Sequence, residues 1–270
     1  MPTLAKQALK WSAAIVDRVL PPPSGVVVLI YHRVGGRSGL DVDLPVAAFE
    51  AQMEILATSG RVVSMDAALD QLHQATPADP PGVVITFDDG TADFVDVAVP
   101  ILERWNLPST LYLATAFIDE GRDFPHDGRP LSWAAVQDAH ATGNVTVGSH
   151  THTHALLDRL PPSRIDAELD RADDLIAEHI DSRPRHFAYP KAVAGSSPAD
   201  AATRVRYRSA ALAGTHANPI GATDPHRLAR SPIQRSDRER FFSAKLNGGM
   251  RFEDSLRATA NRWRYRDATG

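Results

Sequence analysis

Two adjacent carboxylates, Asp88 and Asp89, follow a short segment at 83–87 and precede Gly90. The segment is apolar, β-branched or aromatic throughout, which is typical of a strand buried on both faces. In α/β folds, catalytic groups gather where such strands end. Neighbouring carboxylates repel each other in a confined site unless a cation lies beside them, so the pair indicates a metal ion.

Three alternating histidines, His150, His152 and His154, follow a second predicted strand at 145–148. In an extended segment all three would point to one side. A helical turn would instead place His150 and His154 on one face, at the i, i+4 spacing of helical zinc sites. The apolar residues at 155–157 favour the turn. Asp89, His150 and His154 would then form a tetrahedral site with one open position.

Zinc is the expected ion for these three ligands, and the same nitrogen and oxygen donors also accept cobalt or nickel. The chain contains no cysteine, which excludes disulfides, thiolate metal sites and a cysteine nucleophile. A net charge of −4 gives no argument for binding nucleic acid. The chemistry of the chain is therefore expected to depend on carboxylates and imidazoles.

The order of these motifs resembles the polysaccharide deacetylase family, also called the NodB homology family or the family four carbohydrate esterases. The likeness extends over about 26–233 and is carried by three motifs: Thr86-Phe87-Asp88-Asp89-Gly90, His150-Thr151-x-x-His154 and Phe187-Ala188-Tyr189-Pro190. It implies a distorted (β/α) barrel of about seven parallel strands. It also implies a metal-dependent hydrolase that removes the acetyl group from an N-acetylhexosamine unit of a glycan or glycan precursor.

The resemblance also implies roles for individual residues. Asp88 would be the general base, while Asp89 and the two outer histidines would hold the metal. The backbone N–H of Tyr189 would stabilise the oxyanion, and Tyr189 and Pro190 would line the substrate groove. Many family members have an arginine at the position of Ala188, where it pairs with the catalytic carboxylate.

Arg230 is a candidate substitute for that missing arginine and a candidate contact to the substrate. It lies near Asp224, which could orient a histidine. The adjacent His226 and Arg227 could equally be residues of a surface loop.

His32 follows a predicted buried strand at 26–31 and is expected at the same rim as Asp88. The branch that resembles the poly-N-acetylglucosamine deacetylases begins with a strand ending in Tyr-His, as though the barrel were circularly permuted. That likeness implies that His32 is the general acid for the departing amine. The alternative is a structural histidine whose tautomer is fixed by its surroundings.

Strands and helices alternate along the rest of the chain, as in a parallel sheet, and 270 residues suit one barrel. We expect an N-terminal amphipathic helix and proline-rich linker at 1–23, the deacetylase barrel at 24–240 and a C-terminal helical extension at 241–270. Predicted helices lie at 45–60, from Ser64 onward, and at 91–105, 133–141 and 161–180, and a further strand lies at 110–114.

The apolar run near the N-terminus is too short for a signal sequence or a membrane span, so we expect a cytoplasmic protein. The first helix is expected either to pack on the barrel or to contact a membrane surface.

Two other functions compete with deacetylation. A carbohydrate-binding module on a decayed scaffold predicts missing metal ligands. Another metal-dependent hydrolase would use His150 and His152 as the ligand pair. The expected partner is an N-acetylated sugar or polysaccharide, and the sequence leaves open whether it is a polymer, a lipid-linked sugar, a nucleotide sugar or a small glycoside.

Overall fold

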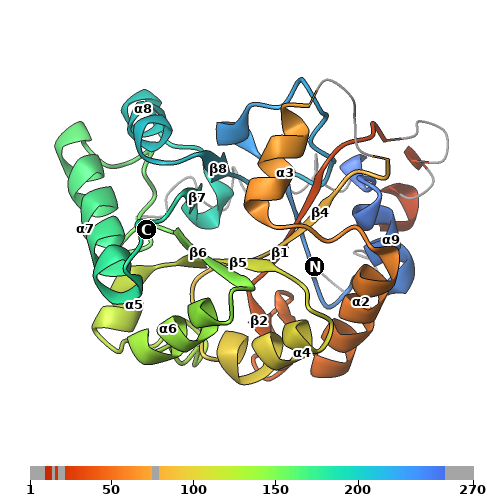
Figure 1. The fold of residues 1–270 in the computed structure, drawn as a ribbon, viewed down its shortest axis with the longest axis horizontal. Helices are drawn as coiled ribbons and strands as arrows, with labels where there is room; N and C mark the ends of the chain where they lie inside the picture. Colours follow the sequence, from red (N-terminus) through yellow and green to blue (C-terminus); the bar gives the residue numbers. More distant parts are fainter. Residues whose placement is uncertain (1–9, 14–15, 18–21, 75–78, 253–270) are drawn as a thin grey trace.

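Seven parallel strands form the central sheet in the computed structural model of the chain (Figure 1). The structure describes residues 10–13, 16–17, 22–74 and 79–252. Every neighbouring pair in the sheet is parallel, in the order β8-β7-β6-β5-β4-β1-β9. The strands are β1 (Val27–Tyr31), β4 (Val83–Phe87), β5 (Ser109–Leu113), β6 (Val145–Ser149), β7 (His186–Ala188), β8 (Ser209–Ala211) and β9 (Arg230–Pro232).

The two ends of this sheet meet, which makes it a nearly closed barrel. Ala211 in β8 forms a parallel bridge with Leu228, and Leu212 N donates to Leu228 O at 2.8 Å. Leu228 leads directly into β9, which pairs with β1. The predicted distorted barrel of about seven parallel strands is therefore confirmed. The first strand lies between β4 and β9.

The helices are close to those that the sequence predicts. The helix at 45–60 ends at Gly60, which adopts the left-handed conformation with φ 62°. Ser64 caps the next helix by accepting a hydrogen bond from Ala67 N at 3.2 Å. The predicted helix at 91–105 begins instead with a π-helical turn. The helices are α2 (Val46–Ser59), α3 (Met65–Leu72), η1 (Phe94–Ala98), α4 (Val99–Arg104), α5 (Thr115–Asp119), α6 (Trp133–Ala141), α7 (Pro162–Ile180), η2 (Pro190–Ala192), α8 (Ser197–Arg206), η3 (Pro225–Arg227) and α9 (Glu239–Leu246), and a small parallel sheet joins β2 (Arg33–Val34) to β3 (Asp43–Leu44).

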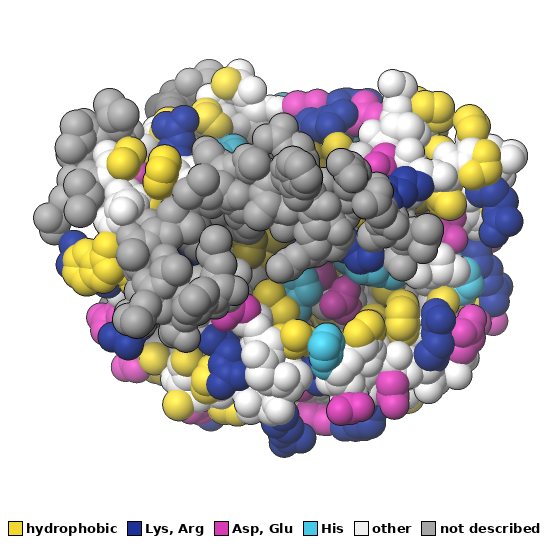
Figure 2. All heavy atoms as spheres, turned by 180° about the vertical axis from the view of Figure 1, so that it is seen from behind, with side chains coloured by type: hydrophobic (Ala, Val, Ile, Leu, Met, Phe, Trp, Pro, Cys, Tyr) yellow, Lys and Arg dark blue, Asp and Glu magenta, His cyan; other side chains and the backbone are white. Residues whose placement is uncertain are grey.

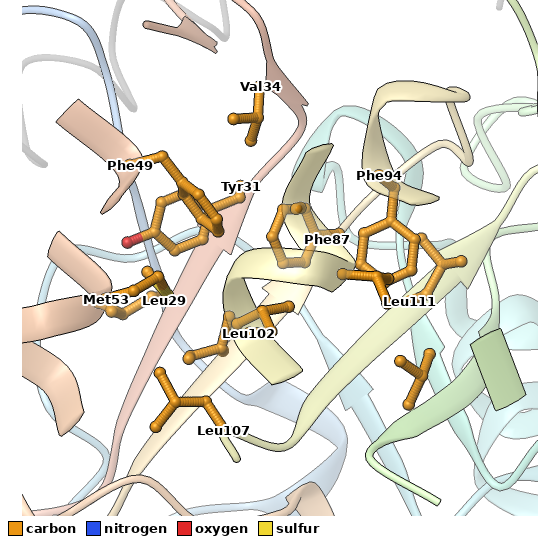
Figure 3. Close-up of a cluster of buried hydrophobic side chains, with 14 of the residues drawn as sticks. Leu29, Tyr31, Val34, Phe49, Met53, Phe87, Phe94, Leu102, Leu107 and Leu111 are labelled. Atoms are coloured by element: carbon orange, nitrogen blue, oxygen red, sulfur yellow. The ribbon is translucent and has the colours of Figure 1, made fainter. Parts of the chain in front are cut away.

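Side chains alternate between the outside and the inside of the barrel along each strand. Outside, Tyr31 and Phe87 pack with Phe49 of α2 and Phe94 of η1 (Figure 3), and the Phe87 and Phe94 rings lie 4.8 Å apart. Inside, smaller residues such as Val28 form a second buried cluster that includes four residues of α3.

Helix α3 covers the amino ends of the strands. Asp66, in its first turn, pairs with Arg185 at 3.0 Å and with Arg208, the residues that precede β7 and β8. The opposite rim, at the carboxyl ends of the strands, is therefore the one left to carry the site.

Residues 10–13 are helical and pack against α9, at the other end of the chain. Lys10 Nζ lies 2.6 Å from Asp237 Oδ1, and Lys245 Nζ lies 2.8 Å from Asp237 Oδ2. All three side chains are at most 1% exposed. Trp11 makes an edge contact with the Phe241 ring, with centroids 5.8 Å apart. The predicted N-terminal helix thus packs on the body of the protein at these residues.

The remaining predicted residues of that helix, and the chain from 253 onward, lie outside the described residues. Among the helices that are described, none has the length and apolar character needed to cross a membrane.

Asp237→Asn is expected to lower the free energy of unfolding by about 3–5 kcal/mol, because it removes the carboxylate that two buried ammonium groups share. Urea unfolding monitored by tryptophan fluorescence measures the change. Asp96→Asn is the matched control, since it removes a carboxylate from an exposed pair with Arg129 and should cost at most about 1 kcal/mol. Equal losses in the two variants would contradict the prediction.

Candidate metal and hydrolytic site

Asp89, His150 and His154 converge at the carboxyl ends of the strands, where their ligand atoms all lie within 4.8 Å of one another. Asp89 Oδ1 is 3.7 Å from His150 Nε2 and 3.5 Å from His154 Nε2. Ligands at about 2.0–2.1 Å in a tetrahedral zinc site lie about 3.3–3.5 Å apart, so these donors fit zinc after small adjustments. Figure 2 shows acidic and histidine side chains gathered in a hollow of this face.

The turn after β4 points the two carboxylates in different directions. Asp88 continues the strand, since its N–H donates to Tyr31 O at 3.0 Å. Asp89 has a φ of 77° and Gly90 a φ of 103°, so the chain reverses sharply here. A Cβ on Gly90 would lie 2.9 Å from a Leu113 methyl group, so the turn has room only for glycine.

A hydrogen bond from Nδ1 to the backbone holds the His150 ring in place. Its Nδ1 lies 2.6 Å from Ala188 O, and its side chain is 2% exposed. A carbonyl can only accept, so Nδ1 donates here, and Nε2 is the nitrogen that faces Asp89. The third motif thus contributes through the backbone of Ala188, the position where many family members have an arginine.

The predicted helical turn after His150 is wrong. Residues 151–154 form an irregular loop in which Thr151 and His154 have φ values of 65° and 62°. Thr151 Oγ1 accepts a hydrogen bond from Ala155 N at 3.1 Å, which offers the backbone an alternative to a helical ladder. The two outer histidines still converge, but through left-handed residues rather than through helical spacing.

His152 is directed elsewhere, with its Nδ1 2.9 Å from Thr115 Oγ1. It does not belong to the ligand group found among the described residues. The alternative ligand pair of His150 and His152 is therefore not assembled.

Burial and the neighbouring His150 lower the pKa of His154 to about 4, although the charge of Asp89 acts in the opposite direction. The imidazole is therefore neutral at physiological pH, which is the form that binds a metal.

Asp88 is paired with Arg230 in a buried, two-pronged ion pair. Arg230 Nη1 and Nη2 lie 2.6 and 2.9 Å from the two Asp88 oxygens, and Nη1 also donates to Thr86 Oγ1 at 3.1 Å. Burial alone would raise the pKa of Asp88, but Arg230 and then His150 hold it well below its usual range. Arg230 thus lies where the sequence predicts a substitute for the missing arginine.

The predicted contact of Arg230 with the substrate is wrong, because its side chain is fully buried inside the barrel. Asp224 does not take part in the site either. It pairs with Arg204 at 3.2 Å, and the adjacent His226 makes a hydrogen bond to Tyr207 O.

His32 follows β1 and faces the same site. Its charge is one of the influences that lower the pKa of Asp88, which places the ring near that carboxylate. The residue is half-buried, and its Nδ1 is buried without a hydrogen-bond partner in the described part of the chain. No partner among the described residues therefore fixes the tautomer of this ring through Nδ1, and its role as general acid stays a prediction.

The predicted roles of Tyr189 and Pro190 do not fit the structure. The Tyr189 N–H donates to Ala211 O at 3.0 Å as part of the sheet, so it is not available to an oxyanion. The Tyr189 side chain is 1% exposed, and its hydroxyl lies 2.9 Å from Thr203 Oγ1. Pro190 is buried as well. Both residues build the barrel wall rather than the groove surface.

A buried network behind His150 was not predicted from the sequence. Tyr207 Oη lies 2.8 Å from Asp173 Oδ1 and 3.4 Å from Ser149 Oγ, and Ser149 immediately precedes His150. Burial raises the pKa of Asp173 to about 6. The signal in the sequence is the position of Asp173 in the apolar stripe of α7, which includes Leu169 and Ile176.

Comparison with known proteins identifies related chains. A profile described as polysaccharide deacetylase matches residues 75–210, half of the chain. The protein YxkH of Bacillus subtilis (strain 168), provisionally named a polysaccharide deacetylase, is 24% identical over 214 residues, which cover 78% of this chain and 73% of YxkH.

Solved structures share the fold. IcaB from Ammonifex degensii aligns with a TM-score of 0.69 at 23% identity, covering 84% of this chain and 97% of IcaB. The deacetylase PplD of Streptococcus pyogenes, solved in complex with acetate, aligns with a TM-score of 0.69 at 19% identity, covering 79% of this chain and 94% of PplD.

Asp173→Asn is expected to stabilise the metal-free protein at pH 8 but not at pH 4. A folded-state pKa of about 6, against 3.8 ordinarily, favours the protonated carboxyl. The protonated Asp173 carboxyl therefore contributes to stability below about pH 4, and this contribution is lost as the pH rises through about 6. The resulting difference in the free energy of unfolding is about 3 kcal/mol. Urea unfolding of both proteins across this range measures the gain. A gain that does not depend on pH would contradict the assignment.

Proposed function

This chain belongs to the polysaccharide deacetylase family, and we propose that it is a metal-dependent hydrolase acting on an N-acetylhexosamine unit of a glycan or glycan precursor. The observation that carries the proposal is the convergence of Asp89, His150 and His154 beside a carboxylate, Asp88, that is held by another cation. The solved complex of PplD with acetate, the product of such a reaction, supports it.

Asp89, His150 and His154 would hold the metal, with zinc expected and cobalt or nickel as alternatives. When bound, such an ion supplies a Lewis acid and lowers the pKa of a water towards about 7. The neutral His154 can bind the metal without losing a proton, and the bond from His150 Nδ1 to Ala188 O leaves its Nε2 as the ligand atom.

Asp88 would accept the proton of the attacking water. Its pairing with Arg230 keeps it ionised at every working pH and fixes both of its oxygens. A carboxylate with such a low pKa is a weak base. Asp88 can therefore accept a proton only from a water whose own pKa has been lowered. Arg230 would therefore act by orientation, through the fixed geometry of its two hydrogen bonds.

His32 would deliver a proton to the departing amine of the sugar. The ring lies at the carboxyl end of β1, next to the strand that carries Asp88. A buried nitrogen without a partner is costly in a folded protein, and a role in proton transfer gives a reason for this one.

Two competing functions are less well supported. A carbohydrate-binding protein on a decayed scaffold predicts the loss of metal ligands, yet all three are present and converge. A metal-dependent hydrolase that uses His150 and His152 predicts that these two rings converge, yet His152 is bonded to Thr115.

Asp88→Asn and His150→Ala are expected to separate catalysis from metal binding. The first should retain the metal while lowering kcat by about 100- to 10,000-fold, because it removes the proton acceptor. The second should lose both metal and activity, because it removes a ligand. Acetate release from N-acetylglucosamine oligomers, with metal content measured on the same samples, gives both quantities.

A chelator should abolish wild-type activity, and added zinc should restore it. Circular dichroism of each variant controls for folding. Loss of metal from Asp88→Asn with retention by His150→Ala would reverse the two assignments, and full activity after chelation would refute metal dependence.

A further inference from the structure

The loop that carries His154 adopts a strained backbone. Thr151 and His154 both have left-handed φ values, and Thr151 is β-branched, a residue type that rarely adopts them. Residues in this conformation persist only where the surroundings fix them. The direction of the His154 ring therefore depends on contacts that hold this loop in place.

One side chain outside the loop supplies such contacts. The N–H and the hydroxyl of Thr153 both donate to Glu168 Oε1, the hydroxyl at 2.9 Å. Thr153 immediately precedes His154, so these two bonds hold the residue just before the candidate ligand. A carboxylate that accepts from a backbone N–H makes a stronger hydrogen bond than a neutral group does.

Glu168 is itself carried by a well-anchored helix. It lies in α7, where the adjacent Leu169 and the preceding Ile165 are buried in a cluster shared with β7 and β8. On the same helix, Asp173 is bonded to Tyr207, which also reaches Ser149. Helix α7 therefore contacts both ends of the histidine segment, at Ser149 before His150 and at Thr153 before His154.

We propose that Glu168 is a positioning residue for the metal site, an inference that rests on the metal site of the proposed function. Glu168 is outside the group of ligand atoms among the described residues, so it acts through Thr153 rather than by coordination. By holding Thr153, it keeps the following His154 ring directed at Asp89. Loss of a group bonded directly to a metal ligand typically costs about 10- to 100-fold in metal affinity. Glu168 acts one residue further away, so we expect a loss at the lower end of this range.

The test is a titration of the full-length, metal-free protein with Co²⁺, followed by visible absorption, and with Zn²⁺ in competition with a chelating dye. Glu168→Ala is expected to weaken binding of both ions by about tenfold. Glu168→Gln should bind within about threefold of wild type, because its amide oxygen can accept the same two bonds. Glu178→Ala is the matched control, an exposed glutamate on the same helix, and should bind like wild type.

Thermal unfolding of the metal-free proteins separates positioning from general destabilisation, since Glu168→Ala should unfold close to wild type. If that variant does not fold, Thr153→Val replaces it, because it removes only the hydroxyl bond and should weaken binding by a smaller factor. Affinities equal to wild type in the folded variant would overturn the proposal, as would a Glu168→Gln variant as weak as Glu168→Ala. A wild-type protein that binds neither ion would refute the metal site itself, which distinguishes the two failures.

Discussion

The ion pair between Asp88 and Arg230 gives two neighbouring carboxylates different tasks. Without it, Asp88 and Asp89 would be two adjacent acids competing for one cation in a buried place, where like charges raise the pKa of one partner. Arg230 takes up both oxygens of Asp88, and Asp89 is the carboxylate that groups with both His150 and His154. The separation requires β9 to lie beside β1, because β9 carries the guanidinium that pairs with the carboxylate.

The strands of the sheet all run in the same direction, and this brings the residues of the site together. The carboxyl ends of β1, β4 and β6 lie at one rim, so His32, the two carboxylates and His150 come together although they are distant in sequence. Backbone groups of the same sheet complete the site, as when Ala188 O fixes the tautomer of His150. Helix α7 extends this support to the loop with His154, whose conformation the sheet does not determine.

Much of the fold and the ligand set could be predicted from the sequence, because periodicity and strand-end placement are local signals. The apolar segment before Asp88 and the capped helix after Ser64 are examples. The conformation after His150 was predicted wrongly, because a threonine hydroxyl bonded to Ala155 N competes with helix formation and its effect is not visible in hydrophobic spacing. Tyr189 was assigned to the oxyanion, yet its N–H is used by β8, a partner set only by the tertiary structure. The support from Glu168 and Asp173 was missed for the same reason, since helix and loop meet only after folding.

The position of the first strand has a consequence for how the chain is made. During synthesis β1 emerges early and can pair with β4 as soon as that strand appears, but its other edge stays open until β9 has been translated. The bond from Lys10 to Asp237 joins residues 227 positions apart, so it too cannot form until Asp237 has been translated. An unpaired strand edge made of apolar residues can associate with other chains. The nascent protein therefore exposes this edge until residues 230–232 have left the ribosome, and the same late strand that closes the barrel delivers the arginine that pairs with Asp88.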